Sequence, residues 1–533
     1  MSTALNSVGV LFCVTVIQRV LWYNAHQILT SGVMSCNKLW GNRMQEMTRR
    51  EWLRMMGAAG LFPFFSNFLQ SDEPTSDLSA SIHIPIDPNN PAIVFDQSKC
   101  VYCGACRRVC RRMMSVDGFY DFKKTGNQPI CIHCGQCSTV CEGEAIVMRP
   151  EWQAVKAAKA AGKTVVVSLS PAVRVAVSEA FGQPAGTFCE GEVIAALRAL
   201  GADYVLDVSF GADLTIIEEA KELVERLKHQ SAPLPQFTSC CPAWVEFCET
   251  YFPHYLPNVS IAKSPIAMQG VAVKTFFAKQ KGLDPKNIFN VALTPCSAKK
   301  FEIRRPEFEV EGMRGMDAIV TVRELADWIR AEKVDYENLS PSSYDSLLGE
   351  ASSAGIIFGN TGGVAEAILR TAYYFYNGTN PPNEFLQFSA VRGLLGTETQ
   401  RPGGLKCATA VFSETCSIKV LVVQGCAHAR EVLEQLQAGT IEADLIEVMA
   451  CEGGCVGGAG LPRAKTIPYL TRAMRQARIE ALYARGDATP LHLAHENPIA
   501  KQFYAQTIGE MEMRKGAPLL QTSYASRAAD LGE

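Results

Sequence analysis

Four cysteines in three widely separated segments are the feature that most constrains how this chain can fold. Cys241 follows a Thr-Ser-Cys tripeptide, Cys296 follows a Thr-Pro dipeptide, and Cys451 and Cys455 lie in the glycine-rich segment 447–460. Four thiolates are the ligand count of one iron–sulfur cubane. None of the segments has the compact cysteine spacing of a ferredoxin, so a cluster that they share would lie in the core of a large domain.

Eight further cysteines form two runs of the pattern C-x2-C-x2-C-x3-C between residues 100 and 141. The runs resemble those of bacterial two-cluster ferredoxins, in which three thiolates bind one [4Fe-4S] cluster and the fourth reaches the other cluster. Structural zinc is the alternative for paired cysteines, but two complete runs favour clusters. The predicted ligand sets are Cys100, Cys103, Cys106 and Cys141 for one cluster, and Cys131, Cys134, Cys137 and Cys110 for the other.

The rest of the chain predicts an α/β fold. With 533 residues it is long enough for two or three domains, and its net charge of −3 gives no electrostatic case for nucleic-acid binding. From residue 164 onward, short β-branched runs alternate with amphipathic stretches, which favours mixed α/β architecture with largely parallel sheets beside an α+β ferredoxin-like domain. The predicted strands are residues 164–169, 204–208, 290–293, 318–322, 355–358, 420–423 and 445–448. The predicted helices are residues 213–228, 322–331, 363–374 and 427–438.

Together, the three dispersed segments resemble the signature of the [FeFe]-hydrogenases, and the resemblance covers residues 92–516. It implies an H-cluster: a [4Fe-4S] cubane bridged by one cysteine sulfur to a di-iron subcluster with carbonyl, cyanide and azadithiolate. It also implies that Cys241, Cys296, Cys451 and Cys455 hold the cubane, with Cys455 as the bridge. The expected activity is reversible H2 oxidation and proton reduction, with electrons relayed through the two accessory clusters.

The same resemblance implies a proton path. Heterolytic cleavage of H2 needs a base near the metal and a route for protons to solvent, and a thiol can give and take a proton near neutral pH. Cys240, adjacent to a ligand, resembles the relay cysteine of the family. Glu219 and Glu222 are three residues apart and share a helix face; Ser260 matches the hydroxyl between them, and Arg226 is expected at the outer end. The alternative for a helical glutamate pair is a solvated face.

The resemblance also assigns residues around the di-iron unit. Lys299 would place a cation beside anionic cyanide, whereas the alternative is a surface lysine. Thr294 stands where the family usually has methionine, so the pocket is expected to be wetter or more open. Ala172 stands where serine is common, so one hydrogen bond to a diatomic ligand is expected to be missing. The residues expected to line it are Met449, Pro171, Ala172, Phe358 and Thr294.

The N-terminal part predicts export. Arg49 and Arg50 precede an apolar stretch, residues 55–69, in the order of a twin-arginine signal. An amphipathic surface helix is the alternative. Export would place the protein in the periplasm; an uncleaved signal would anchor it to the membrane, and without export it would be cytoplasmic.

The C-terminal part, residues 495–516, resembles the small-subunit region of the family fused to the large one, and the residues after Gly516 are expected to be disordered. The predicted division has four parts: residues 1–80 as an extension with the signal, 81–155 as the ferredoxin-like domain, 156–470 as the H-cluster domain, and 471–533 as the small-subunit-like wrap and tail.

Two other functions compete with catalysis. A hydrogen sensor of low activity would share the cofactor, and Thr294 favours it slightly; an iron–sulfur assembly factor would keep the cubane but lose residues of the di-iron pocket. The presence of Cys240, Lys299 and Met449 favours the enzyme. Its expected partners are H2 and protons as substrates, a ferredoxin or a periplasmic cytochrome c as electron carrier, and hydrogenase maturation proteins.

Overall fold

The computed structural model describes residues 83–394, 404–464, 470–509, 511 and 518–532. They belong to one compact unit, Ser81–Glu533. The predicted twin-arginine segment lies outside the described residues. Within the described ranges, no helix combines the length and the apolar character that crossing a bilayer requires.

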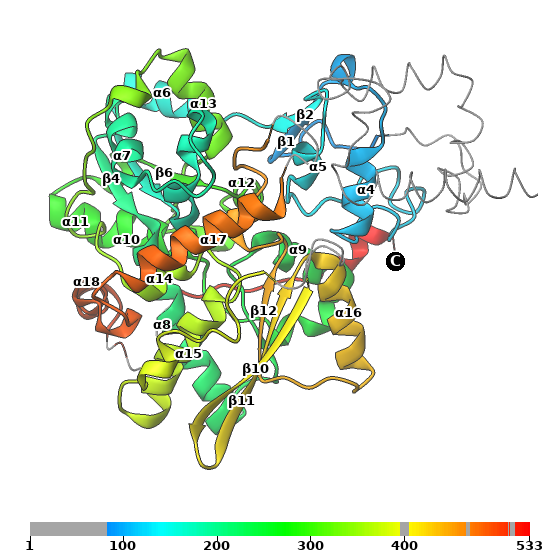
Figure 1. Cartoon of the computed structure of the whole chain (residues 1–533), viewed down its shortest axis with the longest axis vertical. Helices are drawn as coiled ribbons and strands as arrows, with labels where there is room; N and C mark the ends of the chain where they lie inside the picture. Colours follow the sequence, from blue (N-terminus) through cyan, green and yellow to red (C-terminus); the bar gives the residue numbers. More distant parts are fainter. Residues whose placement is uncertain (1–82, 395–403, 465–469, 510, 512–517, 533) are drawn as a thin grey trace, which may run out of the picture. The chain divides into compact units, whose positions relative to one another are not determined.

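The two cysteine runs are carried by a small α+β unit. Strands β1 (Ile93–Phe95) and β2 (Ile146–Met148) pair antiparallel, and helices α4 (Ala105–Arg112) and α5 (Gln136–Thr139) lie between them in sequence (Figure 1). Each helix is preceded by a glycine with positive φ, Gly104 at 67° and Gly135 at 68°. A left-handed glycine lets the chain turn sharply after the second cysteine of each run, which brings the third cysteine back toward the first two.

A four-stranded parallel sheet forms the first layer of the large α/β part, in the order β4-β3-β6-β9. Its β-branched strands are buried because helices cover the sheet. The strands are β3 (Thr164–Leu169), β4 (Tyr204–Asp207), β6 (Ile288–Thr294) and β9 (Ala318–Thr321). The helices that pack on it include α6 (Trp152–Ala160), α7 (Glu190–Ala199) and α13 (Val322–Ala331).

A second sheet has the order β10-β11-β12-β5. Its edge strand β10 (Gly404–Ser413) runs antiparallel to β11 (Cys416–Gln424), whereas β11, β12 (Leu445–Met449) and β5 (Gln236–Phe237) are parallel. A short antiparallel hairpin, β7 (Glu309–Val310) and β8 (Met313–Arg314), stands apart from both sheets. The prediction of a mixed α/β fold with largely parallel sheets is confirmed, and the antiparallel strand β10 is an addition to it.

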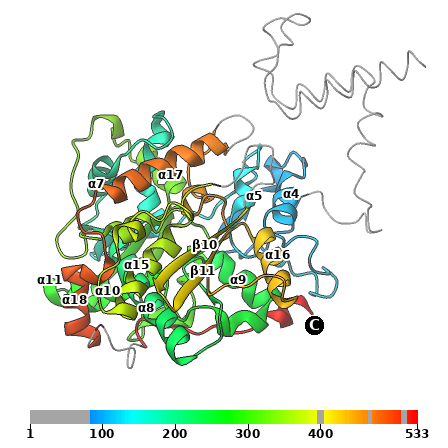
Figure 2. The ribbon, with the colours of Figure 1, turned by 60° about the horizontal axis from the view of Figure 1, so that its bottom comes forward.

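Long helices pack between and around the sheets. Helix α8 (Val208–His229) contacts α10 (Pro265–Ala272) and α15 (Gly363–Asn377), and α15 lies beside β10 (Figure 2). Asp207 caps α8 by accepting a hydrogen bond from the Ser209 N–H, so the helix begins directly at the end of β4. The remaining α-helices of the described residues are α9 (Pro242–Tyr251), α11 (Ala278–Lys281), α12 (Lys299–Glu302), α14 (Ser353–Ile357), α16 (Cys426–Gln437), α17 (Arg472–Asp487) and α18 (Pro498–Phe503).

Two sequence predictions were wrong. Residues 355–358, predicted as a strand, lie at the end of α14, because the Ser352 side chain accepts a hydrogen bond from the Gly355 N–H and starts a helix there. A short buried apolar run does not distinguish a strand from a helix by its periodicity. The second error concerns the chain after Gly516, which was predicted to be disordered: residues 518–532 form hydrogen bonds with the large domain, and their last turn packs against α9.

Candidate active site

The four dispersed cysteines meet at the carboxyl ends of parallel strands from both sheets. Cys241 follows β5, Cys296 follows β6, and Cys451 and Cys455 follow β12. Ligand sites of open α/β sheets characteristically lie outside the carboxyl ends of the strands. All four cysteines line a single cavity, which the ends of the two sheets share.

The cavity suits a metal cluster rather than four free thiols. Burial, together with the neighbouring Cys241 thiol, raises the pKa of Cys296 to about 12, and burial likewise raises the pKa values of Cys241, Cys451 and Cys455. Four buried thiolates would repel one another unless cations lay among them. Hydrogen bonds to sulfur help to hold this charge: the Ala450 N–H donates to the Cys241 Sγ at 3.5 Å.

The number and type of the donors support the same conclusion. All four cysteines line one cavity. The donor set fits a [4Fe-4S] cluster, for which four cysteine thiolates are the usual ligands.

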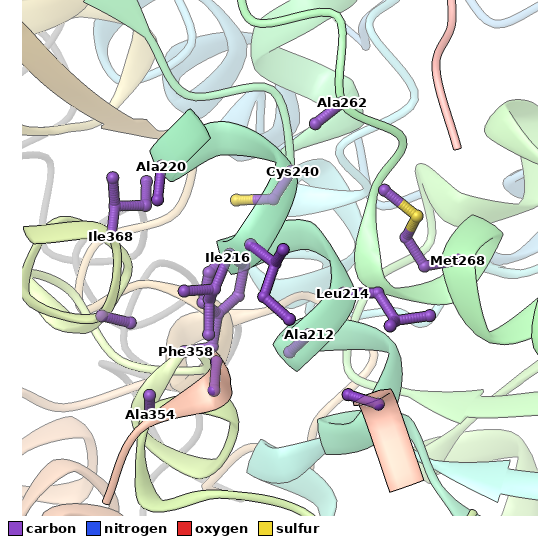
Figure 3. Close-up of a cluster of buried hydrophobic side chains, with 14 of the residues drawn as sticks. Ala212, Leu214, Ile216, Ala220, Cys240, Ala262, Met268, Ala354, Phe358 and Ile368 are labelled. Atoms are coloured by element: carbon purple, nitrogen blue, oxygen red, sulfur yellow. The ribbon is translucent and has the colours of Figure 1, made fainter. Parts of the chain in front are cut away.

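Cys240 and Lys299 lie on the cavity wall beside these four cysteines. Cys240 is buried in an apolar cluster with Ile216 and Ala220 of α8 (Figure 3). The Lys299 Nζ donates to the Cys240 carbonyl at 3.1 Å and to both carboxylate oxygens of Glu302 at 2.8 and 2.7 Å. Burial by itself would lower the pKa of Lys299, but the charge of Glu302 raises it overall, so the lysine is a buried cation and not a surface lysine.

Three of the predicted proton-path residues, Glu219, Glu222 and Arg226, are buried on α8, and Ser260, from the stretch before α10, binds Glu222. The Ser260 Oγ donates to the Glu222 Oε2 at 2.8 Å, and the Arg226 Nη2 donates to the Glu222 Oε1 at 2.7 Å. Arg226, expected at the outer end, is itself buried, and it also donates to the Pro257 carbonyl. The solvated face, which was the alternative for this glutamate pair, is excluded because both glutamates are buried.

Glu219 has a distinct environment at the inner end. Its Oε1 accepts hydrogen bonds from the Ser239 N–H at 2.9 Å and the Ser239 Oγ at 3.1 Å, whereas its Oε2 is buried and has no hydrogen-bond partner among the described residues. Burial raises the pKa of Glu219 to about 8, although Ser239 opposes the shift. A carboxyl group with this pKa and one unpartnered oxygen is suited to hold and release a proton near neutral pH.

The five residues predicted for the di-iron pocket all line the same cavity: Met449, Pro171, Ala172, Phe358 and Thr294. Pro171 and Ala172 follow β3, Thr294 ends β6 and Met449 ends β12, so strand ends supply most of this wall. Apart from Thr294 these side chains are apolar. Such a wall would exclude bulk water from the metal, which strengthens the electrostatic interactions inside.

The predicted ligands of the accessory clusters also come together. Cys100, Cys103, Cys106 and Cys141 line one pocket of the small unit. In the second predicted set, the pKa of Cys134 is raised well above its ordinary value by burial and by the neighbouring thiols of Cys137, Cys110 and Cys131. Backbone N–H groups donate to sulfur in each set: Ile146 to Cys141 at 3.4 Å and His133 to Cys131 at 3.3 Å.

Comparison with known proteins decides the family. A family model described as "Iron only hydrogenase large subunit, C-terminal domain" matches residues 163–459. The chain belongs to the iron-only hydrogenases. In this hydrogenase, residues 472–527 match the model "Iron hydrogenase small subunit", and residues 92–151 match "4Fe-4S dicluster domain".

Individual relatives agree. The hydrogenase is 35% identical over 452 residues to "Iron hydrogenase 1" of Clostridium pasteurianum, covering 82% of this chain and 77% of the relative. It is 44% identical over 315 residues to "Periplasmic [Fe] hydrogenase large subunit" of Nitratidesulfovibrio vulgaris, covering 59% and 72%. A solved apo [FeFe]-hydrogenase of Chlamydomonas reinhardtii superimposes with a TM-score of 0.59 at 34% identity, covering 68% and 94%.

These findings establish the general chemistry. The protein is an [FeFe]-hydrogenase, an oxidoreductase that interconverts H2 with protons and electrons, and its cofactors are an H-cluster and two accessory [4Fe-4S] clusters. Proteins named as iron–sulfur assembly components or factors are similar at 29–30% identity, which is lower than for the hydrogenases, so that alternative is not favoured.

Three residues of the hydrogenase site were missed by sequence reasoning. Gln136 of the small unit donates its Nε2 to the Cys451 Sγ at 3.2 Å. The Glu302 carboxylate accepts a hydrogen bond from the Lys299 Nζ, and the Glu447 carboxylate accepts one from the backbone N–H of Gly362. Only Glu302 had a local signal, since it follows Lys299 by three residues on α12; the other two act across long sequence separations.

Proposed function

We propose that H2 is split or formed in the cavity lined by Cys241, Cys296, Cys451 and Cys455, and that Cys240 passes the proton between the cavity and α8. The observation that carries this proposal is the convergence of the four thiols, Cys240 and the buried Lys299 on one cavity wall. When bound, the H-cluster supplies the redox-active iron at which H2 reacts. The remaining tasks fall to the protein: it excludes water, fixes charge and moves the proton.

The proton route follows from the contacts of the two glutamates. Glu219 Oε2 has no hydrogen-bond partner among the described residues and is the atom suited to exchange a proton with Cys240 Sγ. Ser260 and Glu222, joined at 2.8 Å, continue the route, and Arg226 holds the Glu222 carboxylate in place. Lys299 provides a fixed positive charge for anionic groups of the cofactor.

The test uses full-length protein that is purified anaerobically and matured with a synthetic di-iron cofactor. Cys240→Ala is expected to lower H2 evolution with reduced methyl viologen by about 100-fold or more, the usual contribution of a positioned acid–base group, and to leave the infrared bands of metal-bound carbonyl and cyanide. Cys248→Ala is the matched control, because Cys248 is a buried cysteine on the neighbouring helix α9. Full turnover in Cys240→Ala would contradict the proposed relay, and infrared bands without turnover in the unmodified protein would favour the sensor.

We further propose that an acidic electron carrier, a ferredoxin or a periplasmic cytochrome c, docks on the exposed side of α4. Arg108, Arg111 and Arg112 are exposed there, beside the exposed side chains of Val101 and Tyr102. The Arg108 Nη1 donates to the carbonyl of a predicted ligand, Cys103, at 3.1 Å. A basic rim around a buried cluster would steer an anionic carrier to the point of electron entry.

Charge reversal tests this docking surface. Arg108→Glu is expected to raise the KM for the protein carrier several-fold and to weaken its salt dependence, while turnover with methyl viologen is unchanged. Arg330→Glu, an exposed arginine on α13, is the control. Equal KM values for the two variants would exclude α4 as the docking surface.

We also propose that the protein is exported to the periplasm and that its chain is divided into four parts. A relative named as periplasmic supports a periplasmic location, and the two flanking family matches support separate ferredoxin-like and small-subunit-like parts. The parts proposed are residues 1–80 with the twin-arginine signal, 81–155, 156–470 and 471–533. Replacing Arg49 and Arg50 by lysine should retain the protein in the cytoplasm on cell fractionation; continued export would exclude a twin-arginine signal.

Maturation proteins are required because the chain cannot itself build the di-iron unit.

A further inference from the structure

The C-terminal segment 518–532 runs antiparallel to the short stretch that carries Ser260. Ala262 and Gln521 form an antiparallel bridge. The Lys263 N–H donates to the Leu520 carbonyl at 2.9 Å, and the Thr522 N–H donates to the Ile261 carbonyl at 2.7 Å. Backbone hydrogen bonds from the end of the chain therefore hold the proposed proton path from outside α8.

Tyr524 extends this contact to the path itself. Its hydroxyl donates to the Ser260 carbonyl at 3.1 Å, and the nearby Ser239 side chain opposes the rise that burial causes in the pKa of this hydroxyl. Ser239 binds Glu219, and Ser260 binds Glu222. One phenol hydroxyl thus binds the Ser260 residue that holds Glu222 and lies near the serine that holds Glu219.

The geometry of one peptide unit explains what this contact does. The Ser260 carbonyl and the Ile261 N–H belong to the same planar group. The Tyr524 hydroxyl donates to the carbonyl oxygen of this group. The N–H of the same group, which belongs to Ile261, donates to the Glu222 Oε2 at 3.0 Å. A planar unit that is held at both ends cannot rotate without breaking a hydrogen bond, so its orientation is fixed. The Ser260 hydroxyl, carried on the adjoining Cα, is thereby kept within reach of the Glu222 Oε2 to which it donates.

The far end of the segment is anchored as well. The Arg527 N–H donates to the Glu249 carbonyl at 2.8 Å, and the Arg527 Nη1 donates to the Glu246 Oε1 at 2.9 Å. Glu246 is fully buried on α9 and also bonds the His133 ring. Tyr524 is therefore held between two fixed points, and its position does not depend on a free chain end.

We propose that Tyr524 is a positioning residue for proton transfer, through which the C-terminal segment keeps Ser260 against Glu222 and Ser239 against Glu219. The inference rests on the proposed proton path and adds to it a residue from outside the large-subunit part. It assigns the segment a role in the rate of proton transfer and not in the binding of the cofactor.

The test is Tyr524→Phe in the full-length, matured enzyme, with Tyr255→Phe as the matched control, since the Tyr255 hydroxyl also donates to a backbone carbonyl, that of Leu433. Loss of one hydrogen bond predicts a fall in H2 evolution of about fivefold, with a larger solvent isotope effect in D2O. The KM for methyl viologen and the carbonyl and cyanide infrared bands should stay unchanged. A structural role alone would not move the isotope effect.

A second readout does not need turnover. Hydrogen–deuterium exchange of the amides of residues 261–263 should accelerate in Tyr524→Phe in both the metal-free and the matured protein, and remain unchanged in Tyr255→Phe. Thr522→Pro, which removes the N–H that bonds the Ile261 carbonyl, should produce the same two changes. Unchanged exchange and an unchanged isotope effect in Tyr524→Phe would overturn the proposal.

Glu222→Gln distinguishes a failure of the positioning role of Tyr524 from a failure of the proposed proton path. If it loses turnover while Tyr524→Phe does not, the path holds and the positioning role fails. If Glu222→Gln retains full turnover, the proposed path itself fails.

Discussion

The buried ion pair between Lys299 and Glu302 allows the electrostatics of the site to be tested by one substitution. The side chains are 7% and 4% exposed, and the Lys299 Nζ lies 2.7 Å from the Glu302 Oε2. Removal of one partner of a buried pair typically costs about 3–5 kcal/mol because the other charge is left uncompensated. Glu302→Gln keeps an oxygen that can accept a hydrogen bond from Lys299, or from the Ser264 hydroxyl, which donates to the Glu302 Oε2 at 2.9 Å. We therefore expect the free energy of unfolding to fall by about 3 kcal/mol, the lower end of that range.

The assay is thermal melting of the cluster-loaded protein under anaerobic conditions. For a unit of this size, 1 kcal/mol corresponds to about 1–2 °C, so Tm should fall by roughly 3–6 °C. Glu332→Gln is the control: its partner Lys156 is exposed, and exposed pairs contribute about 0–1 kcal/mol. The double variant Lys299→Met/Glu302→Gln should regain most of the lost stability, because neither charge then remains buried.

Two results would refute this reasoning. If Glu302→Gln melts like Glu332→Gln, then the Lys299 charge is not desolvated. If the double variant is less stable than Glu302→Gln, the destabilisation comes from lost packing and not from an unpaired charge.

Three further predictions concern the loops and ligands of the site. Gly454→Ala should lower the iron content measured on the purified protein, since φ is +81° and a Cβ would lie 2.6 Å from a backbone nitrogen, whereas Gly439→Ala, with open space around it, should not. Gln136→Leu removes the N–H donor to Cys451 and should shift the cubane to a more negative potential in an EPR redox titration; an unchanged potential would contradict this. Burial raises the pKa of Glu447 to about 7 from 4.5. Its contribution to the stability of the folded protein is therefore present below pH 4.5 and is lost as the pH rises through 7. Glu447→Gln should flatten the dependence of Tm on pH in that window.

The sequence predicted those parts of the fold that depend on local pattern. Strands β3 and β12 are rich in β-branched and aliphatic residues, and α13 begins directly after its N-cap, Thr321, with a capping box that Glu324 completes. Residues 355–358 could not be assigned in this way, because their apolar run is too short to show a period, and the capping hydroxyl of Ser352 decides the outcome.

The same distinction between local and long-range signals holds for the residues of the site. The ligand roles of Cys451 and Cys455 could be predicted because both cysteines stand in one continuous segment that resembles part of the family signature. Those of Gln136 and Tyr524 could not, because each acts on a residue that is hundreds of positions away in the sequence and neither stands in a motif. Their roles arise from the packing of the small unit and of the C-terminal segment against the large domain.

Three consecutive residues join the functions of this site. The Ser239 side chain binds Glu219, the Cys240 carbonyl accepts from Lys299, and the Cys241 thiol lines the cavity. Planar peptide units link them, so a shift imposed on one is passed to its neighbours. Glu302 acts on this segment through Lys299, and Tyr524 acts on it through Ser239.

The two contacts should therefore be energetically coupled. Residues that share a backbone segment typically show coupling energies of about 0.5–3 kcal/mol. In a double-mutant cycle of Glu302→Gln and Tyr524→Phe, scored by the solvent isotope effect and the free energy of activation, we expect an effect that differs from the sum of the single changes by at least about 0.5 kcal/mol. Additive effects would mean that the charge beside the cavity and the proton path are set independently, and that the shared segment 239–241 transmits nothing between them.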